Sequence, residues 1–381
     1  MKYLTEYRDP ILAAQYLEEI KKTVTRSWTI MEICGGQTHS LVKYGLLQML
    51  PKEITMVHGP GCPVCVTPTH LIDRAIYLAK ECNVILCSFG DMLRVPGSEK
   101  SLLQAKAEGA DVRILYSPLE AVKLAQQNPD KEVVFFAVGF ETTAPANALS
   151  VIQAHQLGLK NYSIIASHVL VPPAMKALLS DPETVVQAFL AAGHVCTIMG
   201  NTEYYPIVEK YKVPIVATGF EPIDLLHGIL MVVRQLENGE YKLENQYARV
   251  VRERGNLPAQ EAIVEIFEIS NRMWRGMDVI PQSGLEVKEK YAAFDATKKF
   301  NVPLKDIKEN ETCIAGAIMK GLKKPLDCPN FGNACKPSHP LGAPMVSSEG
   351  SCATYYHFYS ALNEVKGVGA WLLFNHINKA I

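Results

Sequence analysis

Three cysteines in the first part of the chain have a spacing that could do chemistry. Cys34 begins the stretch CGGQTH (34–39), and Cys62 and Cys65 form a Cys-X-X-Cys pair within GPGCPVC (59–65). Such a pair suits a redox dithiol, a zinc knuckle or part of a larger metal site. Because no fourth ligand for zinc is evident, three thiols with an open position better suit a soft metal that is bound transiently.

The residues that flank these thiols favour a reactive or metal-binding site. Glycines on both sides allow close backbone approach, and Pro63 stiffens the Cys-X-X-Cys loop. A helical segment follows Pro68, and a thiol near a helix N-terminus has a lowered pKa. His39, His58 and His70 could each bring an imidazole to the thiols. We expect structural hydrogen bonds for His58 and His70, and we favour His39 as a functional residue.

Four further cysteines near the C-terminal end form a second group with the spacing C-x14-C-x6-C-x16-C. They are Cys313, Cys328, Cys335 and Cys352. Four thiolates can hold a tetrahedral zinc ion or a 4Fe-4S cluster. The spacings are longer than those of a zinc ribbon and unlike the compact ferredoxin runs, so ligands from several loops are expected. We expect a 4Fe-4S cluster, with zinc and independently buried thiols as the alternatives.

The composition of the chain argues against several classes of protein. The chain has 381 residues, a net charge of -1 and 48% hydrophobic residues, so it can bury a large core and has no field that would attract nucleic acid. No apolar run approaches the ~20 residues that span a bilayer, and the N-terminal stretch lacks the features of a signal peptide. We expect a soluble cytoplasmic protein that binds neither nucleic acid nor membrane. Phosphate-binding and dinucleotide-binding glycine motifs are absent, as is a Ser-His-Asp signature.

Short apolar runs rich in β-branched residues alternate with helical patterns, which predicts an α/β fold with parallel sheets. We expect strands at 28–33, 54–58, 84–88, 112–116, 133–138, 163–167, 195–199 and 213–218. We expect helices at 10–24, 70–82, 118–128, 173–192 and 257–274. The strands divide into two groups of four, with a break near 127–130.

This pattern predicts two parallel-sheet α/β domains and a third, cysteine-rich iron–sulfur domain. The first α/β domain would span 27–128 and carry CGGQTH and GPGCPVC, and the second would span 129–240 and carry GFETT. The iron–sulfur domain would combine 1–26 with 241–381, so that the N-terminal helix packs onto the C-terminal region.

The expected elements place several polar residues at the ends of strands. Functional loops of parallel sheets emerge at the carboxyl ends of the strands, so Cys34 should come within reach of the Cys-X-X-Cys pair if the first two strands are neighbours. Glu141 follows the fifth strand and could be a general base, a hydrogen-bonding partner or a helix cap. His168 ends the sixth strand at the same edge. His194 is expected at the opposite, amino end of its strand.

Together these motifs resemble the HypD family of hydrogenase maturation factors over nearly the full chain. The resemblance rests on CGGQTH, GPGCPVC, GFETTAP (139–145), GHVCTIMG (193–200) and the spacing of the four tail cysteines. One position departs from the family pattern, because many members read CGGHTH where this chain has Gln37. The departure removes an imidazole at that position and leaves Cys34 and His39 untouched.

The resemblance implies a role in assembling the Fe(CN)2(CO) unit of the nickel–iron hydrogenase active site. Family members form a complex with the small chaperone HypC, and the cyanide ligands arrive from HypE. Cys34 would bind the iron together with the N-terminal cysteine of a HypC-type partner. Cys62 and Cys65 would add ligands or act as a dithiol/disulfide pair that supplies electrons, and the four tail cysteines would hold the 4Fe-4S cluster.

Two other functions stay open at this point. A cluster-linked thiol–disulfide oxidoreductase would act through Cys62 and Cys65 and need Cys34 little. A structural zinc-binding interaction protein would use the tail cysteines for zinc alone. Electron transfer from a cluster to the Cys-X-X-Cys pair requires the two sites to be close in the fold.

Overall fold

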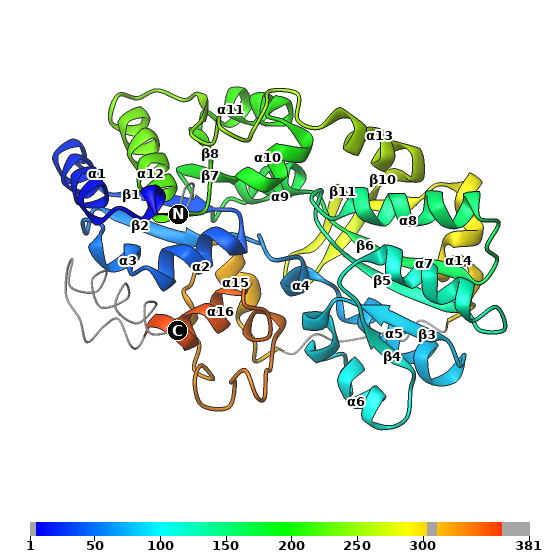
Figure 1. The fold of residues 1–381 in the computed structure, drawn as a ribbon. Helices are drawn as coiled ribbons and strands as arrows, with labels where there is room; N and C mark the ends of the chain where they lie inside the picture. The colour runs from blue at the N-terminus through cyan, green and yellow to red at the C-terminus, as the bar shows by residue number, and fades with distance from the viewer. Residues whose placement is uncertain (1–4, 303–310, 360–381) are drawn as a thin grey trace.

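Two parallel β-sheets form the centre of the molecule in the computed structural model, which describes residues 5–302 and 311–359 (Figure 1). A five-stranded sheet has the order β2-β1-β7-β8-β9, and a four-stranded sheet has the order β4-β3-β5-β6. The first contains β1 (Trp28–Glu32), β2 (Ile54–His58), β7 (Ala188–Ala192), β8 (Ile215–Thr218) and β9 (Leu243–Asn245). The second contains β3 (Ile85–Ser88), β4 (Val112–Ile114), β5 (Val133–Gly139) and β6 (Tyr162–His168). The predicted α/β class with parallel sheets is confirmed.

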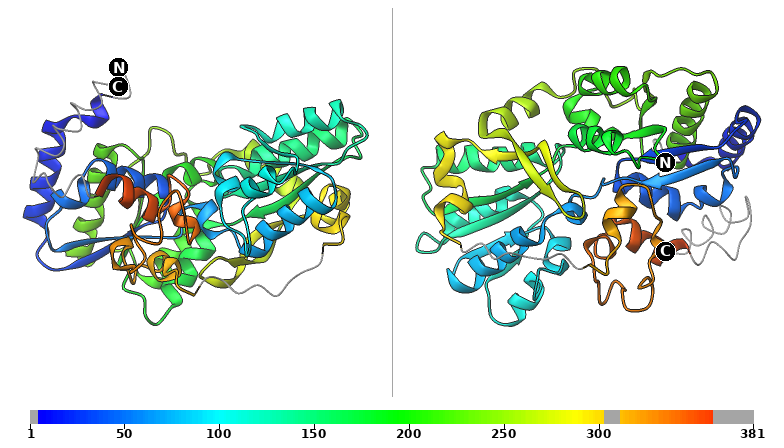
Figure 2. Two further views of the ribbon diagram at one scale, coloured as in Figure 1. Left: turned by 90° about the horizontal axis from the view of Figure 1, so that it is seen from below. Right: turned by 180° about the vertical axis from the view of Figure 1, so that it is seen from behind.

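Helices cover the two sheets, and an antiparallel ribbon packs against the second (Figure 2). The helices of the first half are α1 (Pro10–Thr23), α2 (Gly35–Lys43), α3 (Leu46–Met49), α10 (Gly193–Met199), α11 (Tyr205–Tyr211) and α12 (Pro222–Glu237). Those of the second half are α5 (Thr69–Glu81), α6 (Leu102–Ala107), α7 (Pro118–Gln127), α8 (Ala144–Gln156) and α14 (Ala296–Lys299). The remaining helices are α4 (Pro63–Val66), α9 (Val171–Ser180), α13 (Leu257–Ile266), α15 (Ala315–Met319) and α16 (Ser351–Thr354). The ribbon consists of β10 (Phe267–Trp274) and β11 (Asp278–Val287).

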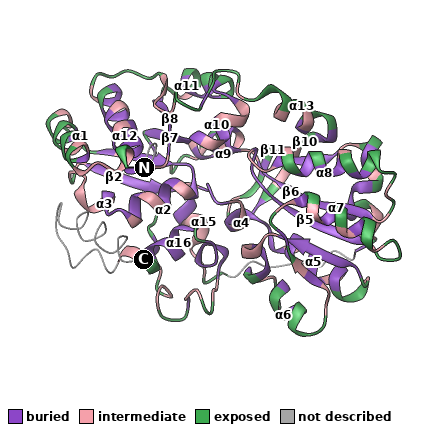
Figure 3. Cartoon of the chain, viewed as in Figure 1, coloured by how far each residue is buried: buried purple, intermediate pink, exposed green. Residues whose placement is uncertain are grey.

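Local sequence explains most of these elements. Every residue of β5, β6 and β7 is buried, as expected for parallel strands that are covered on both faces (Figure 3). Side chains cap the first turns of α1 and α7, where Asp9 and Ser117 accept backbone N–H groups and a proline follows each cap. Each such cap contributes about 1 kcal/mol.

Two predicted helices contain strands. The predicted strand 195–199 lies in α10, and the strand of this region is β7, inside the predicted helix 173–192. Its sequence, AFLAA, is a short apolar run whose periodicity does not distinguish a buried strand from a buried helix. The predicted helix 257–274 ends at Ile266, and β10 continues directly from it because Phe267–Trp274 pairs with β11.

The predicted division of the strands into the first four and the last four is wrong. The chain forms β1 and β2 of one sheet, crosses to form all four strands of the other, and returns for β7, β8 and β9. The ranges 27–128 and 129–240 therefore each contain strands of both sheets. Strand partners in a parallel sheet depend on contacts between distant segments, which the order of elements does not encode.

The N-terminal helix does not pack where it was expected. It packs on α12, beside the first sheet, and buries Ala13 and Ile20 in the same core as Trp28 and Ile30. The C-terminal region contacts α2, α4 and β2 instead, through α16, a 3-10 turn at Ala343–Met345 and α15. A separate iron–sulfur domain stays a prediction.

Candidate thiol and metal site

The first two cysteine motifs meet at the carboxyl edge of the first sheet. β1 and β2 are neighbouring parallel strands, so the loops that follow them lie side by side. Cys34 is the N-cap of α2, and the N–H of Gly35 donates to the carbonyl of Gly61 over 2.9 Å. A Cβ atom at Gly61 would lie 2.4 Å from both N and Cα of Cys34, so only glycine fits. The predicted proximity of the two loops is confirmed.

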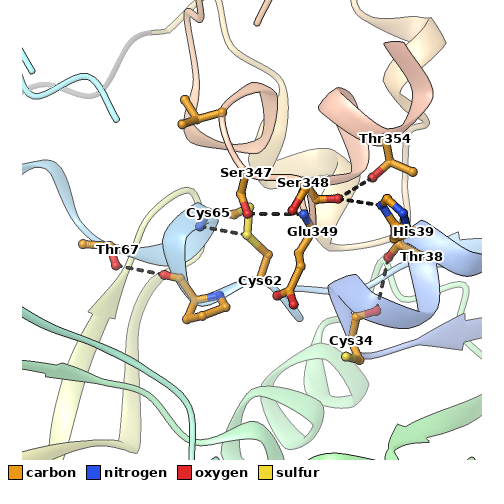
Figure 4. The surroundings of a disulfide bond; sticks show 12 residues. Cys34, Thr38, His39, Cys62, Cys65, Thr67, Ser347, Ser348, Glu349 and Thr354 are labelled. Atoms are coloured by element: carbon orange, nitrogen blue, oxygen red, sulfur yellow. Dashed lines mark hydrogen bonds between the residues drawn. A yellow bond between two sulfur atoms is a disulfide. The ribbon is translucent and has the colours of Figure 1, made fainter. Parts of the chain in front are cut away.

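Cys62 and Cys65 are joined by a disulfide bond, with their Cα atoms 5.2 Å apart (Figure 4). Cys62 is the N-cap of α4, where its Sγ accepts the N–H of Cys65 over 3.2 Å. In this state neither sulfur is a thiolate that could bind a metal. The structure therefore presents the pair in its oxidised, disulfide form.

Cys34 is a free thiol with 2% exposure. Burial raises the pKa of Cys34, and the nearby carboxylate of Glu349 raises it further. These two effects on the pKa of Cys34 outweigh the opposing backbone N–H groups of Gly36 and Gln37 at the start of α2. A bound metal cation would reverse this, since a coordinated thiol is deprotonated outright.

The imidazole of His194 contacts Cys34, which the sequence did not indicate. The Sγ atom of Cys34 lies 3.7 Å from Nδ1 and 3.9 Å from Nε2 of His194. Burial lowers the pKa of His194 to about 4, so the ring is neutral at pH 7, the form that binds metals. The prediction that His194 lies at the opposite edge is wrong because β7 ends just before it, at Ala192. Correct placement of that strand would have revealed the contact.

His39 faces the C-terminal region rather than Cys34. Its Nδ1 lies 3.0 Å from the carbonyl oxygen of Ser348, and its ring packs edge-to-face with Phe358 (Figure 4). Burial lowers the pKa of His39. Gln37, where many family members have histidine, donates from Nε2 to the carbonyl of Ala191 over 3.0 Å and also to Thr218, so it ties α2 to the sheet.

Glu349 is a second residue of the site that the sequence did not indicate. Gly35 packs directly on it, since a Cβ at Gly35 would lie 2.3 Å from the carbonyl oxygen of Glu349. Burial raises the pKa of Glu349. In the view of Figure 4 its side chain lies between the Cys62–Cys65 disulfide and Cys34. A segment near the C-terminal end thus closes a site built by the N-terminal motifs.

Glu141 follows β5 in the second sheet. Its Oε1 accepts the N–H of Val171 over 2.8 Å, and its Oε2 has no hydrogen-bond partner among the described residues. Burial raises the pKa of Glu141 to about 8. The N-cap of α8 is Thr143, so Glu141 does not cap that helix. Of the three roles left open for Glu141, the observed contact is that of a hydrogen-bonding partner.

The four tail cysteines line one small, mostly apolar cavity of about 20 Å³. Its lining consists of Cys313, Cys328, Cys335 and Cys352 with Ile314, Ala315, Ile318, Phe331, Gly342, Pro344 and Met345. Burial raises the pKa of Cys352, and its three cysteine neighbours raise it further. In residues 5–302 and 311–359, no three His, Cys, Asp or Glu side chains are arranged to hold a single metal ion.

Cys65 and Cys313 line an adjoining cavity of about 50 Å³ together with Arg275. The disulfide and the tail cysteines, which are far apart in the sequence, are therefore neighbours in the fold.

Over the described part of the chain, the structure contains no helix with the length and apolar character of a membrane span.

Known proteins resemble this chain along almost its whole length. The HypD family model, described as "Hydrogenase formation hypA family", matches residues 11–359. The hydrogenase maturation factor HypD of Azotobacter vinelandii is 48% identical, with 94% of this chain and 97% of the relative covered. HypD of Rhodobacter capsulatus is 47% identical, covering 95% and 99%, and HypD of Escherichia coli K12 is 44% identical, covering 94% and 98%. With these matches, the chain belongs to the HypD family of hydrogenase maturation factors.

Proposed function

We propose that this protein is an assembly scaffold and redox protein for the Fe(CN)2(CO) centre of nickel–iron hydrogenase. The iron is the cargo, and it binds at Cys34 together with a cysteine of a HypC-type chaperone; a HypE-type protein donates the cyanide. The observation that carries the proposal is the meeting of a free thiol, Cys34, and a disulfide, Cys62–Cys65, at one sheet edge. Family membership supports the role in hydrogenase maturation.

His194 is suited to share the iron with Cys34. With metal–sulfur bonds of about 2.3 Å and metal–nitrogen bonds of about 2.0–2.1 Å, two neighbouring donor atoms lie roughly 3.1 Å apart around an octahedral ion. The observed separations of 3.7 and 3.9 Å are somewhat longer, so Sγ and the ring would have to move closer together on binding.

The tail cysteines fit a 4Fe-4S cluster as the resident cofactor. Four sulfur donors share one mostly apolar cavity. A cluster binds each thiolate to a different iron and so holds the thiolates farther apart than a single ion does, which agrees with the lack of a mononuclear site in the described residues. When bound, the cluster would supply electrons one at a time.

The disulfide is suited to accept reducing equivalents beside the iron site. Opening the Cys62–Cys65 bond consumes two electrons and two protons and yields two thiols, and a one-electron donor must act twice. Cys65 shares a cavity with Cys313, which meets the requirement that the pair lie close to the tail cysteines. The freed thiols then become available as ligands or as reductants for the bound iron.

Infrared spectroscopy of the protein purified anaerobically with its small partner tests the proposal. We expect cyanide and CO bands in the wild type, iron and sulfide in a ratio that fits one 4Fe-4S cluster, and loss of the bands but not of the cluster in Cys34→Ala. His194→Ala should weaken the bands, while Cys82→Ala, at a half-buried cysteine away from the site, should leave them unchanged. Bands of normal intensity in Cys34→Ala would refute iron binding at this thiol.

A cluster-linked thiol–disulfide oxidoreductase is the second candidate, favoured by the cavity that Cys65 and Cys313 share. Under this second candidate function, disulfide reduction would be the only activity of the protein. Cys34→Ala would then support hydrogenase maturation at the wild-type level, whereas Cys65→Ser would abolish it.

A further inference from the structure

A buried chain of hydrogen bonds runs from the backbone of Cys34 to the C-terminal region. The N–H of Cys34 donates to Oε2 of Glu32 over 3.1 Å. The other carboxylate oxygen of Glu32 lies 2.6 Å from Nδ1 of His58. The Nε2 atom of His58 lies 2.8 Å from the hydroxyl of Tyr355. These four residues therefore form one continuous path across three segments of the chain.

The path is fully enclosed by protein. Glu32 is 0% exposed, and His58 and Tyr355 are each 2% exposed. The carboxylate of Glu32 also accepts the hydroxyl of Thr38, so both of its oxygens are satisfied. We assign the Nδ1 proton to His58 because the carboxylate accepts it, which leaves Nε2 to accept the phenolic proton of Tyr355. A buried network in which every member is satisfied is rigid and specifies one arrangement.

The sheet register creates the central pair of this path. Glu32 and His58 are the last residues of β1 and β2 and are opposite each other in the parallel pairing. Each therefore immediately precedes one of the two cysteine loops. Tyr355 is the third residue after Cys352 and begins the π-helical turn Tyr355–Tyr359. It reaches His58 because the adjoining α16 packs on α2.

We propose that Glu32, His58 and Tyr355 are positioning residues. Through them, the segment 351–355 orients Cys34 when it is packed in the position that the structure shows. The inference rests on the proposed function, in which Cys34 binds the iron and Cys352 holds part of the cluster. A cofactor held by Cys352 would keep the Tyr355 hydroxyl on His58, which fixes Glu32 and so the backbone N–H of Cys34. Loading of the tail cysteines would thereby prepare the iron site, a coupling that must act equally in both directions.

Hydrogen–deuterium exchange of peptides that contain residues 33–36, in the full-length protein, measures this positioning directly. Losing one net hydrogen bond of the path should speed exchange of the Cys34 amide about fivefold. We expect that increase in Tyr355→Phe, and also in wild-type protein after its iron and sulfide are removed. Exchange in β5 should not change in either case.

Three variants separate positioning from general loosening. Tyr162→Phe is the matched control, since it removes another buried tyrosine hydroxyl, which lies 2.8 Å from Ser150 in the second sheet. It should leave the Cys34 amide protected. His58→Leu should break the path, whereas His58→Gln offers one donor and one acceptor and should restore most of the protection.

The outcomes for the inference and for the proposed function are distinct. Wild-type exchange of the Cys34 amide in Tyr355→Phe would overturn the inference, even if the protein holds a normal cluster and binds iron. Equal exchange in loaded and metal-free wild type would overturn the coupling. If wild-type protein takes up no iron and sulfide, the proposed function fails. In that case the seating of 351–355 does not depend on a cofactor, and comparing Tyr355→Phe with the wild type still decides whether the path holds Cys34.

Discussion

Gly61 is the residue at which the two cysteine motifs touch. Its hydrogen atom faces the backbone of Cys34, and its carbonyl accepts the N–H of Gly35. Glycine is needed at position 61 because there is no room for a side chain, and not because of its backbone angles. The site thus depends on a residue that performs no chemistry itself.

Gly61→Ala should therefore destabilise the fold. The added methyl group would lie 2.4 Å from two backbone atoms that cannot move independently of α2. Overpacking of this kind costs about 1–3 kcal/mol, which urea denaturation would detect. Gly90→Ala is the control, because its methyl group would meet only a side-chain atom of Ile114 at 3.7 Å. Equal denaturation midpoints for Gly61→Ala and the wild type would contradict the proposed contact.

Glu141 should make stability depend on pH. Burial raises the pKa of Glu141 from 4.5 to about 8, so the folded protein keeps a proton that the unfolded chain releases. The stability gained from this proton is complete below the unfolded pKa and falls as the pH rises through about 8, by up to about 1.4 kcal/mol per pH unit. Glu141→Gln should remove this dependence.

The measurement is urea denaturation of both proteins at several pH values. The free energy of unfolding of the wild type relative to Glu141→Gln should decrease between about pH 5 and pH 8. Parallel pH profiles for the two proteins would show that Glu141 is ionised in the folded state.

At the scale of elements, the disulfide closes a loop too short to add much stability. The bonded cysteines are separated by three positions in sequence, and the chain-entropy estimate for such a loop is about 2 kcal/mol or less. We therefore infer that the disulfide serves mainly as a redox group and only to a small extent as a stabilising cross-link. This agrees with its position beside the cavity that Cys313 lines.

Reduction of the Cys62–Cys65 bond should consequently leave the protein folded. We expect a phosphine reductant to lower the free energy of unfolding by about 2 kcal/mol or less, measured by urea denaturation under anaerobic conditions. Cys62→Ser should show the same small loss without reductant and no further change with it. A reductant-induced collapse of the fold would identify the bond as structural.

The elements that the sequence predicted correctly are those with strong local signals. β1 and β2 are short apolar runs, and α5 and α7 combine amphipathic periodicity with a proline or capping residue at their starts. The prediction missed β7 because its alanine-rich sequence has no such signal. The candidate site divides in the same way. Two neighbouring strands sufficed to bring Cys34 near the Cys-X-X-Cys loop, whereas His194 required the true end of β7 and Glu349 required the packing of a distant segment.

At the scale of the whole molecule, the C-terminal region joins parts that the chain order separates. It contacts α2, α4 and β2, and it supplies Ser348 to His39, Tyr355 to His58 and the tail cysteines to the cavity beside Cys65. The described helices of this region are only a few residues long, so their own hydrogen bonds stabilise them little. The proposed 4Fe-4S cluster would add stability that such short helices lack.

If the proposed cluster is present, its loss should unfold this region selectively. Metal-binding energy is folding energy in small metal-dependent units, so Cys328→Ala should lose iron and sulfide together with the hydrogen-exchange protection of residues 311–359. The amides of β5 and β6 should stay protected, because these two strands are buried in the second sheet and do not contain the tail cysteines. Cys82→Ala is the matched control and should keep both its iron and its protection. Normal protection of 311–359 in an iron-free Cys328→Ala protein would show that packing against α2 and β2 holds the region without a cofactor, and the cysteine cavity would then need another explanation.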